Sequence, residues 1–90
     1  MAQQGMDVFE KRVLDIIIGS RNIDRKTVTA DTKLDAIGIS SLEALALAFD
    51  IEAEFGISVP DSEILKLRTV GDVYAGVRRL LEEQKGAQSQ

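Results

Sequence analysis

The chain has 90 residues, enough for one domain, and carries 15 acidic and 11 basic side chains, for a formal net charge of -4. It contains no cysteine and no histidine, which excludes disulfides, thiolate nucleophiles, Cys/His zinc sites and a Ser-His-Asp triad within the chain. Any thiol chemistry must therefore come from a cofactor. The acidic balance argues against binding to nucleic acid or an anionic membrane surface, and favours partners with basic surfaces.

The first residues and the apolar runs show no targeting or membrane segment. Residues 1–6 lack a basic region leading into an apolar stretch, so they are not typical of a signal peptide. The longest apolar runs, such as residues 44–49, are far shorter than a membrane span. We expect a cytoplasmic protein that does not insert into a membrane.

The first predicted element is an amphipathic helix over residues 7–18. Phe9, Val13 and Ile16 recur at spacings of four and three, which is the helical period. Gly19 is a suitable C-terminal stop.

Residues 20–37 predict a long ordered loop between the first two helices. The segment is polar and rich in turn-forming residues, with single apolar side chains that would anchor it to the core: Ile23, Val28, Leu34 and Ile37. A loop of this length inside a small domain is uncommon and often functional.

A second helix is predicted to begin near Ser40 and to end at residue 54 or 55, before Gly56. Leu42, Leu45 and Phe49 are predicted to form its buried stripe, together with Ala46 and Ala53.

The last third of the chain predicts a short helix and a longer one. Residues 61–65 predict a short helix capped by Asp61 or Ser62. Thr69 and Asp72 have the spacing of a capping box, and the apolar residues that follow at spacings of three and four are Val70, Val73, Val77 and Leu80. The sequence therefore predicts an all-α bundle of three longer helices and one short helix with a long first loop, formed by a single domain over residues 1–83 and followed by a disordered tail at 84–90.

Residues 34–45 hold the most informative motif. Ser40 and Ser41 stand at the start of the second helix, directly after a turn that contains Gly38. Unpaired backbone N–H groups and the positive end of the helix dipole lie at such a position, and both favour a bound or attached phosphate. We expect Ser41 to be exposed, Leu42 and Leu45 to anchor the helix to the core, and Ser40 to serve as the helix cap.

This segment resembles the motif of the acyl carrier protein family, Leu-Gly-x-Asp-Ser-Leu, in which the serine carries the prosthetic group. The likeness runs without a gap from residue 34 to about residue 77, and includes Phe55, Pro60, Glu63 and the pair Thr69–Val70. The resemblance implies an acyl-carrier-like bundle with no catalytic residues of its own. It implies that Ser41 carries 4'-phosphopantetheine and that acyl groups are held on it as thioesters.

The resemblance also implies a set of partners. They are a phosphopantetheinyl transferase and the acyl-transferring and synthase enzymes of fatty acid, specialised lipid or polyketide synthesis, which would dock through basic surfaces. The residues predicted to contact them are Ser40, Leu42, Glu43 and Glu52. A further hypothesis is an acyl cavity lined by Leu45, Ala46, Phe49, Ile64 and Leu67, although these side chains also suit a plain core.

Two positions depart from the family pattern. Ser40 stands where the family has an aspartate, and Ala46 stands where it has a glutamate. These changes favour a specialised carrier over the general carrier of fatty acid synthesis. Two alternatives stay open, namely a carrier for aminoacyl or peptidyl groups and an unmodified helical interaction module. We expect a monomer, since no apolar stripe is predicted to be left over for self-association.

Overall fold

The computed structural model describes residues 8–19 and 21–88, with the side chains described as far as residue 84. Its elements are α1 (Val8–Ile18), the 3-10 turns η1 (Arg25–Thr27) and η2 (Asp35–Ile37), α2 (Ser41–Phe55), α3 (Asp61–Ile64) and α4 (Val70–Gln88). Over these residues the only β-type pairing is one isolated bridge between Lys33 and Thr69. The predicted all-α fold, with one short helix and a long first loop, is confirmed.

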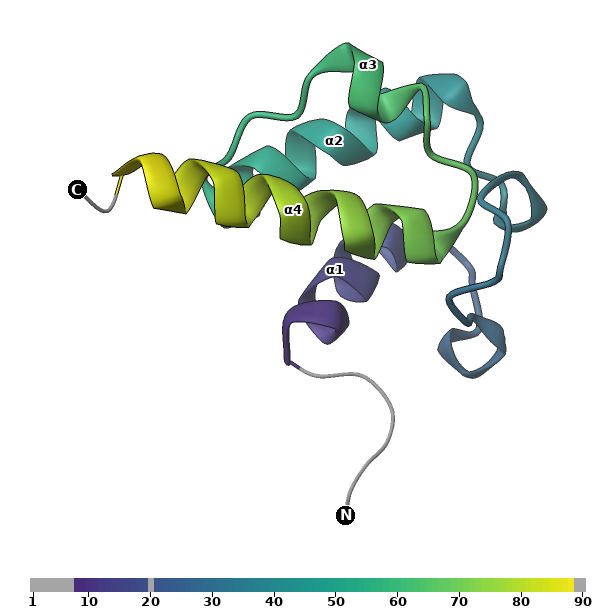
Figure 1. Cartoon of the computed structure of the whole chain (residues 1–90). Helices are drawn as coiled ribbons and strands as arrows, with labels where there is room; N and C mark the ends of the chain where they lie inside the picture. Colours follow the sequence, from purple (N-terminus) through teal and green to yellow (C-terminus); the bar gives the residue numbers. More distant parts are fainter. Residues whose placement is uncertain (1–7, 20, 89–90) are drawn as a thin grey trace.

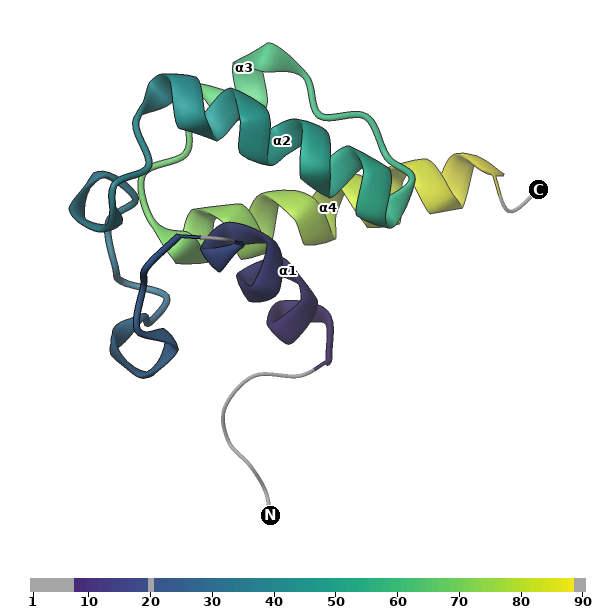
Figure 2. The same ribbon diagram turned by 180° about the vertical axis from the view of Figure 1, so that it is seen from behind.

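The helices enclose one core. Figures 1 and 2 show α2 and α4 running along each other, with α1 lying across them. α3 lies on the side opposite α1, within the segment that connects α2 to α4. α1 packs against both α2 and α4, while α3 packs against α2. The buried side chains come from all four helices and from the connecting segments: Val13, Leu14, Ile17, Val28, Leu34, Ile39, Ala44, Leu47, Ala48, Ile51, Ile57, Ile64, Val70, Val73, Val77 and Leu80. Among the described residues, no helix has the length and apolarity that crossing a membrane requires.

α4 folds as its sequence pattern predicts. The apolar residues from Val70 to Leu80 named above are all buried. The capping box is reciprocal, because the Thr69 hydroxyl accepts from the Asp72 N–H at 3.1 Å and the Asp72 carboxylate accepts from the Thr69 N–H at 3.1 Å.

α1 follows its prediction with a small rotation. The helix begins at Val8, and the predicted first residue, position 7, lies outside the described residues. Val13, Leu14 and Ile17 are buried, whereas Phe9 and Ile16 are only partly buried. Leu14 was not part of the predicted stripe.

The predicted buried face of α2 is wrong. The helix buries Ala44, Leu47, Ala48 and Ile51, while the side chains of Leu42 and Phe49 are 76% and 67% exposed. Both sets of residues have helical spacing, because α2 is apolar on two opposite faces, so periodicity alone cannot choose between them. The face that turns inward joins the single buried core with side chains of the other three helices.

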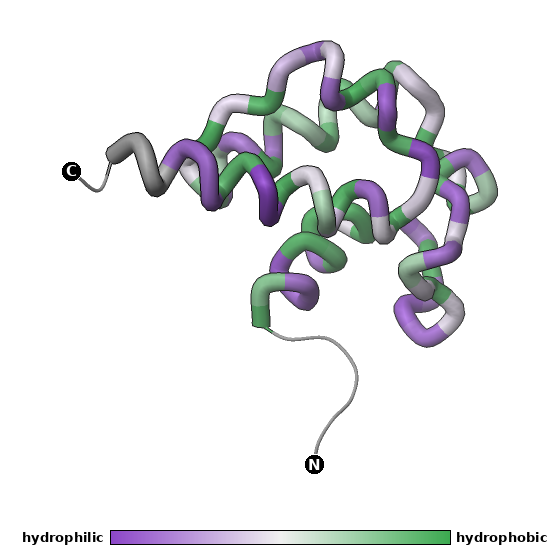
Figure 3. The backbone as a smooth tube through the Cα atoms, viewed as in Figure 1, coloured by the Kyte–Doolittle hydropathy of each residue, from purple (hydrophilic) through white to green (hydrophobic). Residues whose placement is uncertain are grey.

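The segment that joins α1 to α2 is anchored to the core as predicted, and it is also hydrogen-bonded to α4. Val28 and Leu34 are buried and Ile23 and Ile37 are partly buried, which confirms the four anchors in a stretch that is otherwise largely hydrophilic (Figure 3). Ile39, 3% exposed, is a fifth anchor that the prediction missed.

Two backbone hydrogen bonds join this segment to the beginning of α4. The carbonyl of Thr32 accepts from the Val70 N–H at 2.9 Å, and the carbonyl of Ala30 accepts from the Gly71 N–H at 2.8 Å. These two amides begin a helix and have no partner within it. The loop therefore caps α4 with its own backbone and is held in place by it.

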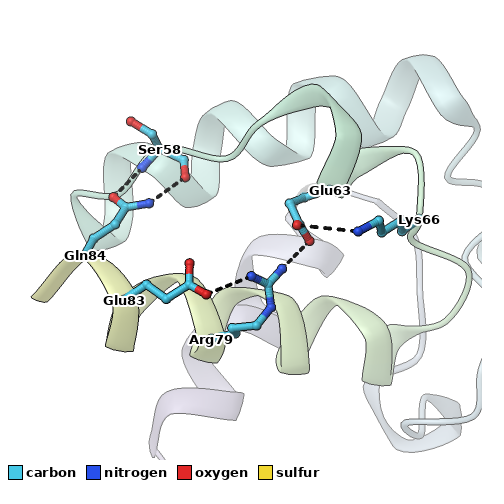
Figure 4. Close-up of polar contacts among 6 residues, drawn as sticks. All are labelled: Ser58, Glu63, Lys66, Arg79, Glu83 and Gln84. Atoms are coloured by element: carbon cyan, nitrogen blue, oxygen red, sulfur yellow. Dashed lines mark hydrogen bonds and ion pairs between the residues drawn. The ribbon is translucent and has the colours of Figure 1, made fainter. Parts of the chain in front are cut away.

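The end of α4 differs from the prediction of a disordered tail over residues 84–90. The helix continues to Gln88, and residues 89 and 90 lie outside the described residues. One reason is the Gln84 side chain, which accepts from the Ser58 N–H at 3.0 Å and donates to the Ser58 carbonyl at 2.9 Å (Figure 4). This two-way contact ties the last part of α4 to the strand-like segment after α2.

The short helix α3 is held mainly by its neighbours. Pro60 occupies the cap position and makes no side-chain cap hydrogen bond, so the predicted capping by Asp61 or Ser62 is wrong. Instead, the Glu63 carboxylate forms an ion pair with Arg79 of α4, and Arg79 also contacts Glu83 at 3.1 Å (Figure 4). The hydrogen bond from Arg79 lowers the pKa of Glu63.

Candidate functional site

The two serines at the start of α2 have different positions. Ser40 is the N-cap residue, and its Oγ accepts from the Glu43 N–H at 3.3 Å. Ser41 is the first residue of the helix and is exposed. The predicted helix start, with Ser40 as the cap, is confirmed. Because serine and aspartate are both strong N-cap residues, Ser40 can keep the cap while removing the charge that an aspartate would place there.

The turn before the helix sets the direction of α2. Gly38 ends η2 with a φ of 85°, a left-handed conformation that side chains disfavour. The turn lets Ile39 enter the core while Ser41, two residues later, faces solvent. The buried Ile39 side chain therefore anchors the backbone that carries the exposed Ser41 hydroxyl.

Two backbone N–H groups without a partner among the described residues lie at the Ser41 position. Across residues 8–19 and 21–88, no acceptor is found for the N–H of Ser41 or of Leu42. Such N–H groups and the helix dipole together make a favourable environment for a phosphate.

An open groove of about 830 Å³ lies beside Ser41, between the first half of α2, α3 and the segment before α2. Its lining is mostly apolar and includes Leu42, Leu45, Ile64, Leu65 and Leu67. Three residues of the predicted acyl cavity, Leu45, Ile64 and Leu67, therefore meet on one surface.

The other two predicted cavity residues lie elsewhere. Ala46 and Phe49 are exposed and are not in the lining of this groove. The reason is the rotation of α2, which turns both of them away from α3 and toward solvent.

The interior between α2, α3 and α4 is closely packed. An apolar crevice there has a volume of only about 20 Å³, room for about one water molecule. Leu67 lines both this crevice and the groove, while Gly76 lies at the α4 side of the crevice.

Two acidic side chains of α2, Glu43 and Glu54, form ion pairs within the molecule. Glu43 forms an ion pair with Arg21 at 2.5 Å, and Glu54 forms one with Arg12 at 2.5 Å. Sequence reasoning missed both arginines, because the two pairs are separated by 22 and 42 residues of the chain, respectively, and no local pattern connects them.

Glu52 has a structural use as well. Its carboxylate accepts from the Val59 N–H at 2.6 Å and holds the segment after α2 against the helix. The structure thus favours this role over the partner contact predicted for Glu52.

The site offers a hydroxyl that another enzyme can modify, and it contains no catalytic residues. Ser41 presents a hydroxyl that can be esterified, in a chain without histidine or cysteine. Within the described part of the chain, no group of three or more acidic side chains could hold a metal ion. A small helical bundle with an exposed serine at a helix start is the arrangement expected of a carrier domain.

Comparisons with known proteins identify the kind of carrier. Residues 11–77 match the family described as "Phosphopantetheine attachment site". The acyl carrier protein of Thermotoga maritima is 37% identical over 76 residues, which cover 83% of this chain and 93% of that protein. The acyl carrier protein of Porphyromonas gingivalis is 30% identical over 78 residues, covering 86% and 100%.

Solved structures agree with this assignment. The crystal structure of the Thermotoga maritima acyl carrier protein has a TM-score of 0.72 at 28% identity, and the match covers 88% of this chain and 98% of that one. The acetyl actinorhodin acyl carrier protein of Streptomyces coelicolor, at 22% identity and a TM-score of 0.67, shares the fold. The chain belongs to the acyl carrier protein family. It is a carrier without catalytic activity of its own, and its cofactor is phosphopantetheine.

Proposed function

We propose that Ser41 is the residue that carries 4'-phosphopantetheine, and that the chain delivers acyl groups to enzymes of fatty acid, specialised lipid or polyketide synthesis. One observation carries the choice of serine. The Ser40 hydroxyl is occupied as a helix cap by the Glu43 N–H, while Ser41 is exposed at the first position of α2.

The residues around Ser41 fit a phosphodiester. The N–H groups of Ser41 and Leu42 can donate to its oxygens, and the start of α2 favours its negative charge. When attached, the group supplies the thiol that a chain without cysteine lacks. The protein's part is to hold the base of the arm on a rigid helix, while the groove beside it offers apolar surface.

Acyl cargo is supported over aminoacyl cargo by the relatives, which are named acyl carrier proteins. The apolar groove lined by Leu45, Ile64 and Leu67 agrees with a hydrocarbon chain. Because the crevice in the core holds only about 20 Å³, a cargo that enters the bundle must first separate α3 from α2. Monomeric state and cytoplasmic location stay predictions.

The test is the modification of Ser41. The protein is incubated with coenzyme A and a broad-specificity phosphopantetheinyl transferase, and its intact mass is measured. As the Ser41 Oγ–phosphorus bond forms, the hydroxyl proton is released, the pyrophosphate bond of coenzyme A breaks and adenosine 3',5'-bisphosphate leaves, so the mass should rise by one phosphopantetheine group.

The controls are a matched pair of serine variants. S41A should show no mass gain, whereas S40A, which loses only the cap, should still be modified. No gain in the unchanged chain with several transferases would leave the helical interaction module as the function. A gain that persists in S41A would place the attachment elsewhere.

A further inference from the structure

Arg21 joins the end of α1 to the beginning of α2. Its Nη1 atom donates to the carbonyl of Ile17 at 2.9 Å, and its Nη2 atom pairs with the Glu43 carboxylate at 2.5 Å. The Ile17 carbonyl lies in the last turn of α1, where carbonyls have no partner within the helix. The Arg21 side chain is only 26% exposed. Two contacts from two helices therefore fix its guanidinium beside the first turn of α2.

The first turn of α2 holds half of a capping box. Ser40 and Glu43 stand three positions apart at the helix start, which is the spacing of a complete box. In a complete box the hydroxyl accepts from the glutamate N–H, and the glutamate carboxylate reaches back to the N–H of the cap residue. Here the Ser40 Oγ accepts from the Glu43 N–H at 3.3 Å, but the carboxylate pairs with Arg21. Among the described residues, the Ser40 N–H has no acceptor.

The box at the start of α4 is complete by comparison. The Asp72 carboxylate accepts from the Arg68 N–H at 2.9 Å and from the Thr69 N–H at 3.1 Å. A carboxylate three residues after the cap thus binds the amides at the helix start in this same chain. Glu43 has the equivalent position in α2, and what distinguishes it is its ion pair with Arg21.

We propose that Arg21 is a positioning residue for the modification of Ser41, because it holds the Glu43 carboxylate away from the amides at the start of α2. These amides are the N–H groups of Ser40, Ser41 and Leu42, none of which has an acceptor within the described residues. Without Arg21, the carboxylate would close the box and place a negative charge against the incoming phosphate. The inference rests on the proposed function of Ser41.

The test is the rate at which a broad-specificity phosphopantetheinyl transferase modifies Ser41 with coenzyme A. R21Q should lower kcat/KM by about two- to fivefold, which is the effect expected from the loss of one exposed ion pair. In an E43Q background, which lacks the competing charge, R21Q should cause no further loss. R12Q is the matched control and should leave the rate unchanged, because Arg12 pairs with Glu54 at the same distance of 2.5 Å near the other end of α2.

Three results would overturn the role of Arg21. An unchanged rate in R21Q would show that Glu43 does not compete with the phosphate. A faster rate would show that the ion pair hides a carboxylate that the transferase needs. An equal loss of rate in the E43Q background would show that the arginine acts directly on the phosphate or on the enzyme.

The NMR signal of the Ser40 amide gives a measurement that does not depend on the transferase. In R21Q this amide proton should move to lower field, because it gains a charged acceptor. The shift should be reversed in R21Q/E43Q, a reversal that a merely structural role of Arg21 would not produce. An unmoved Ser40 signal in R21Q would mean that the box stays open without the arginine, and would also overturn the proposal.

The proposed function and the role of Arg21 fail in different ways. No mass gain in the unchanged chain would overturn the function of Ser41 and this inference with it, whereas a normal gain at equal rates in R21Q would overturn only the inference. R21Q also loses the contact with the Ile17 carbonyl, so the rates are compared at a temperature at which circular dichroism shows every variant to be folded.

Discussion

α2 and α4 are the two longest helices, and they differ in how many apolar faces they carry. α4 has one stripe, and that stripe is buried. α2 has two stripes on opposite sides, of which one is buried and one is exposed. A single stripe is fully used by the fold, whereas a second stripe costs solubility without adding to the core. Its presence beside Ser41 therefore suggests a use outside the fold.

The largest expected effect separates the two faces of α2. Leu47 is 2% exposed and Leu42 is 76% exposed, although each is a leucine on the same helix. L47A should lower the free energy of unfolding by about 2–5 kcal/mol, because it leaves a cavity. L42A should change it by less than about 0.5 kcal/mol. Urea unfolding of both variants measures this, and equal losses would contradict the assignment of the two faces.

The next effect concerns the loop that caps α4. A Cβ added to Gly71 would lie 2.9 Å from the carbonyl oxygen of Ala30, the same oxygen that accepts from the Gly71 N–H. We expect G71A to lower the free energy of unfolding by about 1–3 kcal/mol, since the loop must shift.

Gly76 is the matched control in the same helix. A Cβ at Gly76 meets no atom within 4 Å, and alanine is the better helix former. G76A should therefore stabilise the protein by up to about 1 kcal/mol. A stabilising G71A in the same urea experiment would show that the contact between loop and α4 is loose.

A smaller effect compares the caps of the two helices. The Thr69–Asp72 box makes two reciprocal hydrogen bonds, while Ser40 makes one at 3.3 Å. T69A should cost about 1 kcal/mol and S40A somewhat less. Thermal unfolding followed by circular dichroism can rank them, and a larger loss in S40A would reverse the order.

These comparisons show which features the sequence could predict. Local signals were reliable where one physical requirement determined the structure: the cap at Ser40, the capping box at Thr69 and the stripe that begins at Val70. They failed where two answers satisfied the same requirement, as for the faces of α2.

Long-range contacts were out of reach for a different reason. The pairing of Glu43 with Arg21 and of Gln84 with Ser58 depends on how the helices meet in space. The second of these contacts joins Gln84, the first residue of the predicted tail, to the segment after α2. Similarly, the position of Ser41 could be inferred from its motif, but the exposure of Phe49 required the packed structure.

The smallest effect tests how α4 uses its polar face. Arg79 holds α3 through Glu63, and the hydrogen bond from Arg79 lowers the pKa of Glu63 below its ordinary value. A carboxyl group with a lowered pKa in the folded state stabilises the fold fully above its unfolded pKa, and this contribution is lost as the pH falls through the folded pKa. The unchanged chain should therefore lose stability below about pH 4.5 more steeply than E63Q, by a small margin because Arg79 is exposed to solvent. Urea midpoints measured between about pH 3 and pH 7 would show this difference.

E83Q is the control, since Glu83 contacts the same arginine without joining α3 to α4. Parallel pH curves for the unchanged chain and E63Q would mean that α3 is held by the burial of Ile64 alone, and that the polar face of α4 adds nothing to the attachment of α3.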